Sequence, residues 1–114
     1  MLSEEEGCAV LKRVFEERGF AISERFPFEE EGVAFNADGW DPAARVGYEY
    51  MSRSDGDHED LDPDELAVLG GWMEEGRLFL FVIDETDIDD ADELAAAARA
   101  FLDEVERRRA RGGG

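Results

Sequence analysis

The sequence predicts an α/β (α+β) fold, a three-layer sandwich in which helices cover both faces of a mixed four-stranded sheet. Helical periodicity marks both ends of the chain, and three short segments of alternating polarity lie between residues 20 and 52. A third observation is the unbroken apolar run "LFLFVI" at residues 78–83, which is too short for a helix and typical of a strand covered on both faces. Such a strand needs helices on both sides of the sheet, so the expected order of elements is α-β-β-β-α-β-α.

Residues 3–19 are expected to form the first helix. Ser3 is a good N-cap residue, the three glutamates after it lie against the positive end of the helix dipole, and Gly19 can end the helix. Four apolar residues recur at helical spacing: Val10, Leu11, Val14 and Phe15. This helix is therefore amphipathic and packs one face against the rest of the domain.

An antiparallel meander of three strands is expected next. "FAISERF" alternates apolar and polar residues with one polar intrusion at Glu24, "PFEEEG" is expected to be a turn, "VAFNAD" a second strand and "GWDPAA" a connection. The third strand is "RVGYEYMS". Its alternation places two sets of side chains on opposite faces: Val46, Tyr48 and Tyr50 on one, and Gly47, Glu49 and Met51 on the other.

The second half of the chain reads as a helix, a strand and a helix. Asp62 before Pro63 predicts the start of a helix that runs to about Gly76, because proline is favoured at the first helical position. The run "LFLFVI" is expected to be the central strand of the sheet, joined through this helical crossover. A last helix is expected from Asp90 to about Arg111. The inward residues of the helix before this strand are expected to be Leu66, Leu69, Trp72 and Met73. Those of the last helix are expected to be Leu94, Ala97, Ala98, Phe101, Leu102 and Val105.

Length and composition indicate one folded domain with a strongly negative field. The chain has 114 residues, of which 43% are hydrophobic, so residues 1–111 are expected to form a single domain and 112–114 a flexible glycine tail. The balance of 31 acidic against 12 basic residues gives a formal net charge of -19. This charge repels nucleic acids and anionic membranes and attracts basic proteins. The single Cys8 and the lack of an apolar N-terminal segment make a cytoplasmic location the expectation.

Two acids fall on neighbouring predicted strands: Asp38 ends "VAFNAD" and Glu49 lies in "YEYM". With the order of elements over about residues 3–84, this resembles the core of the PD-(D/E)XK nuclease-like superfamily. The resemblance implies a Mg²⁺- or Mn²⁺-dependent phosphodiesterase with Asp38 and Glu49 as metal ligands. The family's lysine, two positions after the second acid, is replaced here by Met51, and the only lysine is Lys12 in the first helix. An inactive relative is therefore the alternative within this resemblance.

Independently of any family, carboxylates on neighbouring strands suit a hard divalent cation. Asp38, Glu49 and Asp41 are the candidates. The interpretation that we favour is that Asp38 and Asp41 are turn residues, because Asp-Gly and Asp-Pro are common in turns. Glu49 lies inside a strand, where it either binds metal, faces solvent or pairs with an arginine.

The acidic segment of residues 55–65, "DGDHEDLDPDE", does not fit a calcium loop, because its sixth position lacks glycine and its twelfth lacks glutamate. His58 has no second histidine or cysteine beside it, so a zinc site is not predicted. We expect a non-catalytic interaction or regulatory module without a cofactor that binds a basic protein partner, and a metal-dependent phosphodiesterase is the alternative. A homodimer through an exposed sheet edge is left open. The residues expected to contact the partner are Asp55, Asp57, Glu59, Asp60 and Trp40.

Overall fold

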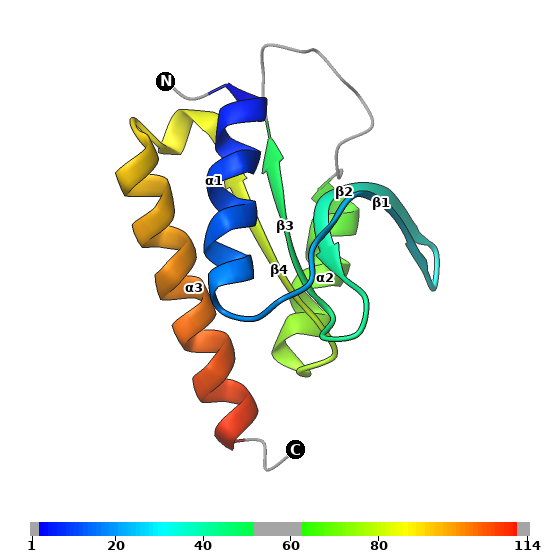
Figure 1. Ribbon diagram of the computed structural model, residues 1–114. Coiled ribbons are helices and arrows are strands. Elements are labelled where there is room, and N and C mark those ends of the chain that lie inside the picture. The colour runs from blue at the N-terminus through cyan, green and yellow to red at the C-terminus, as the bar shows by residue number, and fades with distance from the viewer. Residues whose placement is uncertain (1–2, 52–62, 112–114) are drawn as a thin grey trace.

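The structure, a computed structural model, describes residues 3–51 and 63–111 and has the predicted order α-β-β-β-α-β-α (Figure 1). Its elements are α1 (Glu4–Glu17), β1 (Ser23–Glu30), β2 (Val33–Asp41), β3 (Val46–Met51), α2 (Pro63–Glu74), β4 (Phe79–Asp84), the short 3-10 helix η1 (Glu85–Asp87) and α3 (Ala91–Arg111). The predicted fold class is confirmed. Neither part of the described chain contains a helix that is long and apolar enough to cross a membrane.

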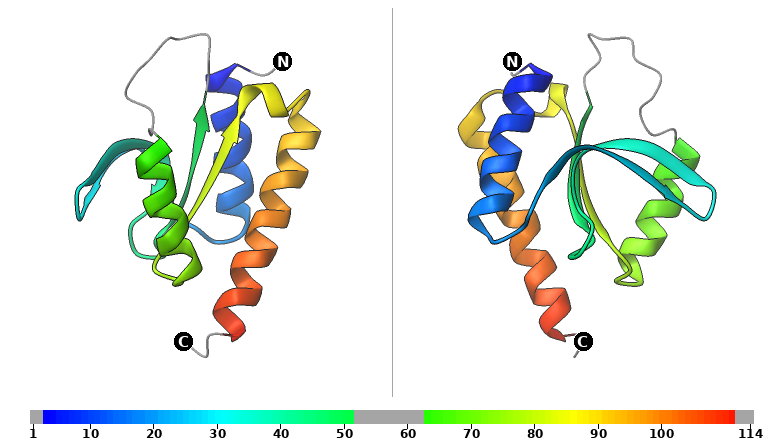
Figure 2. Two further views of the ribbon diagram at one scale, coloured as in Figure 1. Left: turned by 180° about the vertical axis from the view of Figure 1, so that it is seen from behind. Right: turned by 45° about the vertical axis from the view of Figure 1, so that its right-hand side comes forward.

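The four strands form one mixed sheet in the order β1-β2-β3-β4. β1 pairs antiparallel with β2, β2 antiparallel with β3, and β3 parallel with β4. α1 and α3 lie side by side on one face of the sheet and α2 covers the other (Figure 2). The prediction that "LFLFVI" is the central strand is wrong, because β4 lies at an edge. An unbroken run of apolar residues indicates that both faces of a strand are covered, but it does not indicate which strands lie beside it in the sheet.

Two apolar cores fill the space on either side of the sheet. In the first, between the sheet and the α1–α3 pair, the Phe15 ring meets Tyr48 edge to face at a centroid distance of 5.1 Å. In the second, between α2 and the β1–β2 hairpin, the Trp40 ring meets Phe28 at 5.3 Å. The predicted alternation of β3 is confirmed, since three of its side chains lie in the first core: Val46, Tyr48 and Tyr50.

The β1–β2 hairpin is longer than the sequence predicts. "PFEE" belongs to β1 and "GWD" to β2, so the interpretation of these segments as a turn and a connection is wrong. Pro27 is tolerated because β1 is an edge strand. The chain crosses from one core to the other near Arg25, whose φ is 52°: Ile22 packs on the first core and Phe28 lies in the second. The hairpin therefore curves away from β3 and covers α2.

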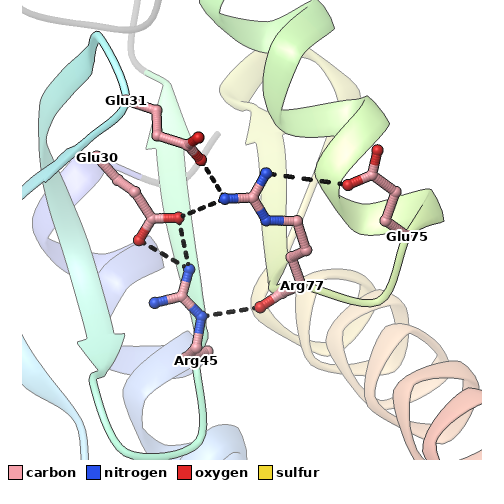
Figure 3. A network of polar contacts seen from close by, with 5 residues as sticks. All are labelled: Glu30, Glu31, Arg45, Glu75 and Arg77. Atoms are coloured by element: carbon pink, nitrogen blue, oxygen red, sulfur yellow. Dashed lines mark hydrogen bonds and ion pairs between the residues drawn. The ribbon is translucent and has the colours of Figure 1, made fainter.

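A network of ion pairs holds the far end of this hairpin (Figure 3). Glu30 accepts from Arg45 at 3.0 Å and from Arg77 at 3.3 Å, and Arg77 also pairs with Glu31. Arg45 Nε donates to the Arg77 carbonyl oxygen at 2.8 Å, and the Arg77 guanidinium lies 4.6 Å from the Trp72 ring centre. The contacts join the hairpin to the residues just before β3 and β4.

The described N-terminal ends of α1 and α3 follow the capping rules, while Asp62, the predicted N-cap of α2, lies outside the described residues. Ser3 Oγ accepts from the Glu6 amide and the Ser3 amide donates to Glu6, both at 3.1 Å, which completes a capping box at the start of α1. Asp90 Oδ1 accepts from the Glu93 amide at 2.8 Å at the start of α3. Gly19 has a φ of 94°, a conformation that suits glycine and follows the end of α1.

Candidate functional site

An open groove of about 1090 Å³ lies between α1 and the strands β1 and β2. The β1–β2 hairpin curves away from the rest of the sheet (Figure 2). Polar side chains of α1 and β1 line the space between these two elements. Helical spacing places the lining residues of α1 on one side of the helix. The groove is lined by Glu4, Glu5, Cys8, Ala9, Lys12, Arg13, Glu16 and Glu17 of α1, by Glu24 and Arg25 of β1, and by Asp38 of β2.

The groove is acidic. Six carboxylates face three cationic side chains, which leaves a formal excess of three negative charges among the lining residues. Lys12 Nζ of α1 and Glu24 Oε1 of β1 form an ion pair at 2.7 Å that connects the two walls. This hydrogen bond raises the pKa of Lys12 and lowers that of Glu24. Since Lys12 is already paired with a carboxylate of the groove, it adds little attraction for an incoming anion.

Cys8 and Asp38 meet where α1 faces β2. Burial raises the pKa of the Cys8 thiol far above its ordinary value, and the negative charges of Asp38, Glu4 and Glu49 raise it further. The thiol is therefore protonated at neutral pH and donates to the Asp38 carboxylate. A protonated, half-buried thiol is a poor nucleophile, in agreement with the excess of glutamates in the first turn of α1.

Asp38 and Glu49, the two predicted metal ligands, lie opposite each other where β2 separates from β3. The two strands pair only from Gly39↔Tyr48 to Asp41↔Val46. Beyond that point the Asp38 amide donates to Glu49 Oε1 at 3.1 Å, and the Tyr50 amide donates to Asp38 Oδ2 at 2.8 Å. The structure thus brings the two carboxylates together, and each of them accepts a hydrogen bond from the backbone of the opposite strand.

Asp41, the third candidate ligand, stabilises the β2–β3 turn. It is 6% exposed and accepts from the amides of Ala21 at 2.9 Å and of Ala43 and Ala44 at 3.0 Å. Burial alone would raise the pKa of Asp41, but the hydrogen bonds from Ala44, Ala21 and Ala43, together with the nearby charge of Arg109, outweigh it and lower the pKa. Asp41 is the last residue of β2, and its carboxylate caps the turn that follows, whereas Asp38 lies further inside β2 and not in a turn.

The described residues do not form a ready metal site. In residues 3–51 and 63–111, no three His, Cys, Asp or Glu side chains gather in a way that would hold a metal ion. Asp38 and Glu49 are already hydrogen-bonded to backbone amides, so a cation there would compete with those bonds. Metal binding by Asp38, Glu49 and Asp41 stays a prediction.

The predicted partner-binding residues have two different outcomes. Asp55, Asp57, Glu59 and Asp60 lie outside the described residues. Trp40, named as a possible contact residue although tryptophan is more often found in a core, is only 2% exposed and lies in the second core. Its ring is buried because β2 continues through Gly39 and turns the indole toward α2 and away from solvent.

The sequence reasoning missed the groove itself, although one signal for it was present. Glu24 interrupts the apolar alternation of its strand, and in the structure this polar residue pairs with Lys12 across the groove. The polar face of the first helix supplies the other wall. Neither the polar face of the first helix nor the polar residue in the strand predicts by itself that α1 and β1 face each other across a groove.

Comparison of the chain with protein-family models, with curated proteins and with solved structures gave no match. The resemblance to the PD-(D/E)XK nuclease-like superfamily stays a prediction.

Proposed function

We propose that this protein is a non-catalytic interaction module that binds a basic segment of a protein partner in the groove between α1 and β1. The observation that supports the proposal is the charge of the lining, in which six carboxylates face three cationic side chains. Arginine and lysine side chains of a partner would find carboxylate acceptors on both walls of the groove.

The charge of the whole chain supports the same partner chemistry. A formal net charge of -19 accelerates the approach of a cationic surface and slows that of an anionic one. Long-range attraction of this kind is not specific, because the acids are spread over the whole surface. The groove adds a concave site in which several partner side chains can be engaged at once.

Nucleic acid is a poor candidate for the same groove. Binding to phosphate requires cationic side chains that neutralise the backbone. The three cationic residues of the groove lie among six acids, and Lys12 and Arg13 have carboxylate partners in Glu24 and Glu17 at 2.7 and 3.9 Å. The local field therefore favours a basic ligand.

Calorimetric titration with a short arginine-rich peptide tests the proposal. In the groove variant, Glu5→Gln and Glu16→Gln are combined, which removes two exposed carboxylates from α1. In the control variant, Glu29→Gln is combined with Asp92→Asn, which removes two exposed acids outside the groove. Both variants lose the same net charge, so non-specific attraction weakens equally in both.

We expect saturable one-to-one binding that is about ten-fold weaker in the groove variant, since two exposed charge contacts contribute about 1 kcal/mol or slightly more in total. The control variant should bind nearly as well as the wild-type protein. Equal weakening in the two variants would show that only the overall charge attracts the peptide, and the groove would then lose its proposed role.

A divalent-metal-dependent phosphodiesterase is the second candidate. It is favoured by the closeness of Asp38 and Glu49 and by Lys12, the only lysine, which lines the same groove as Asp38. It ranks second because the two carboxylates are engaged with the backbone and because the groove is acidic. Titration with Mn²⁺ separates the two candidates.

A further inference from the structure

The outer edge of β4 has no strand beside it within residues 3–51 and 63–111. The Phe79 amide donates to the Arg45 carbonyl oxygen at 3.0 Å, on the β3 side. Because backbone groups alternate along a strand, the amides of Leu80 and Val82 point to the opposite, outer side. The Leu80 amide meets the Met73 sulfur at 3.4 Å there.

The two edges of the sheet differ in how they are protected against pairing with another strand. β1 contains Pro27, several glutamates and Arg25 with a φ of 52°, which are features that block the addition of a strand. β4 is apolar from Phe79 to Ile83, with no proline and no charged residue. Its residues from Phe81 onward are partly exposed, although helices cover both faces of the sheet. An open apolar edge of this kind favours the addition of a strand.

Charge is distributed unevenly along this edge. Beside the end of β4, residues 84–93 include seven acids and no basic residue. Beside its start, α3 ends with four arginines between Arg107 and Arg111, and the guanidiniums of Arg108 and Arg109 both lie 5.4 Å from the centre of the Phe79 ring. Arg107 is paired with Glu104, and the other three arginines, Arg108, Arg109 and Arg111, line a hollow together with two acids, Glu74 and Glu75. The edge is therefore acidic at one end and basic at the other.

We propose that β4 pairs antiparallel with β4 of a second copy of this chain. The antiparallel arrangement places the acidic end of each edge beside the basic end of the other, so the edge is complementary to itself. The four-stranded sheets of the two copies then join into one continuous sheet. Parallel pairing would bring the two acidic ends together and is disfavoured.

The ion pairs of α3 show which of its sides faces α1 and which faces away. Arg99 and Asp103 of α3 pair with α1 residues Glu17 and Arg18, so they lie on the α1 side of the helix. Helical spacing places Ala97 on the opposite side of the helix, together with Glu93, Glu104 and Arg108. The groove proposed above lies beside β1, at the other edge of the sheet, and stays accessible in the dimer.

Molar mass measured by light scattering as a function of protein concentration tests the dimer, at low and at high salt because the net charge opposes association when it is unscreened. Val82→Lys places a charge in β4, where the Val82 side chain is only partly buried beside the second core, and Val68→Lys makes the same substitution at an exposed site on α2. We expect the mass of the wild-type protein and of Val68→Lys to double with concentration, and that of Val82→Lys to stay monomeric.

Amide exchange in the wild-type protein gives a second readout that needs no variant. If β4 pairs with β4, exchange at the Val82 amide should slow as protein concentration rises, because the amide gains a hydrogen-bond acceptor only in the dimer. A wild-type protein that stays monomeric at both salt concentrations overturns the proposal. A dimer in which exchange at Val82 is independent of concentration also overturns it, because its interface then lies elsewhere.

Discussion

The Asp38 and Glu49 carboxylates each accept a hydrogen bond from a backbone amide of the opposite strand, at the point where β2 leaves β3. The Glu49 carboxylate accepts from the Asp38 amide at 3.1 Å, and the Asp38 carboxylate accepts from the Tyr50 amide at 2.8 Å. In a continuous ladder these amides would donate to backbone carbonyl oxygens, and here the two carboxylates replace those acceptors. Buried backbone amides need such hydrogen-bond acceptors. β2 can therefore leave β3 and follow β1 over α2 without exposing or orphaning these amides.

Replacing Asp38 with alanine tests this structural role. The variant leaves the Tyr50 amide without its carboxylate acceptor, and Tyr50 is only 1% exposed. We expect the free energy of unfolding to fall by about 1–3 kcal/mol, the usual cost of an unsatisfied buried donor. Urea denaturation measures it, and the exposed acid Glu29, replaced with alanine, is the control, with an expected change within about 0.5 kcal/mol. A similar small change in both variants would contradict the role given to Asp38.

Titration with Mn²⁺ separates the two candidate functions. If Asp38 and Glu49 only accept hydrogen bonds from backbone amides and bind no metal, Mn²⁺ binding should be weak and non-saturating, as expected for loose attraction to a net charge of -19. The Glu49→Gln variant should then bind Mn²⁺ like the wild-type protein. Calorimetry at moderate salt is the measurement. Saturable binding at one site that is lost in Glu49→Gln would instead support the metal site and justify a phosphodiesterase assay.

Local signals in the sequence were sufficient for the helices. The capping box at Ser3 and the N-cap at Asp90 depend on residues three positions apart, and both are present. The fold class followed from the apolar run of β4, because a strand buried on both faces needs two helical layers. The position of β4 at the edge of the sheet depends on pairing between distant segments, which the apolar content of one segment does not predict.

Turn signals misled the prediction of the first hairpin. Pro27 and Gly39 are common in turns, yet Pro27 is accommodated in an edge strand and Gly39 lies inside β2. The sequence predicts that Asp38 and Glu49 fall on neighbouring strands, and consecutive antiparallel strands bring such positions close. The hydrogen bonds that the two carboxylates accept from the opposite strand were not predictable, because they depend on where β2 leaves β3. The groove was not predictable because it depends on how α1 lies beside β1.

Gly39 lies directly beneath the Tyr48 ring, which leaves no space for a larger residue at this position. A Cβ atom at this position would overlap the ring of Tyr48, which is 1% exposed in the first core. We expect Gly39→Ala to destabilise the protein by about 1–3 kcal/mol, the range for overpacking a core. Thermal or urea denaturation gives the value. The same substitution in a Tyr48→Leu background should cost clearly less, because the overlapping ring is gone.

A matched control for this substitution is Gly70→Ala in α2. Apart from the adjoining residues and the backbone of α2 itself, no atom of the described residues lies within 4 Å of a Cβ built at Gly70. Alanine is favoured over glycine in a helix by up to about 1 kcal/mol. Gly70→Ala should therefore leave stability unchanged or raise it. If Gly39→Ala had the same effect as Gly70→Ala, the close approach of Tyr48 to the β2 backbone would be excluded.

Asp41 should make the stability of the protein depend on pH in the acid range. Its pKa is lowered in the folded state, because hydrogen bonds from three backbone amides outweigh the effect of burial. The pKa of aspartate in an unfolded chain is about 3.9, so the unfolded state takes up a proton first as the pH falls. The stabilisation is therefore fully present above the unfolded pKa and is lost as the pH falls through the lower, folded value.

The difference in unfolding free energy between the wild-type protein and Asp41→Asn isolates this contribution, because the titration of all other acids is common to both proteins. The difference should be about 1–3 kcal/mol at neutral pH, where asparagine offers one acceptor oxygen in place of two. It should stay constant down to about pH 4 and then shrink, because below that pH the wild-type carboxylate becomes protonated. Urea titrations at a series of pH values measure it, and a difference that grows as the pH falls would show that the hydrogen bonds do not stabilise the ionised form.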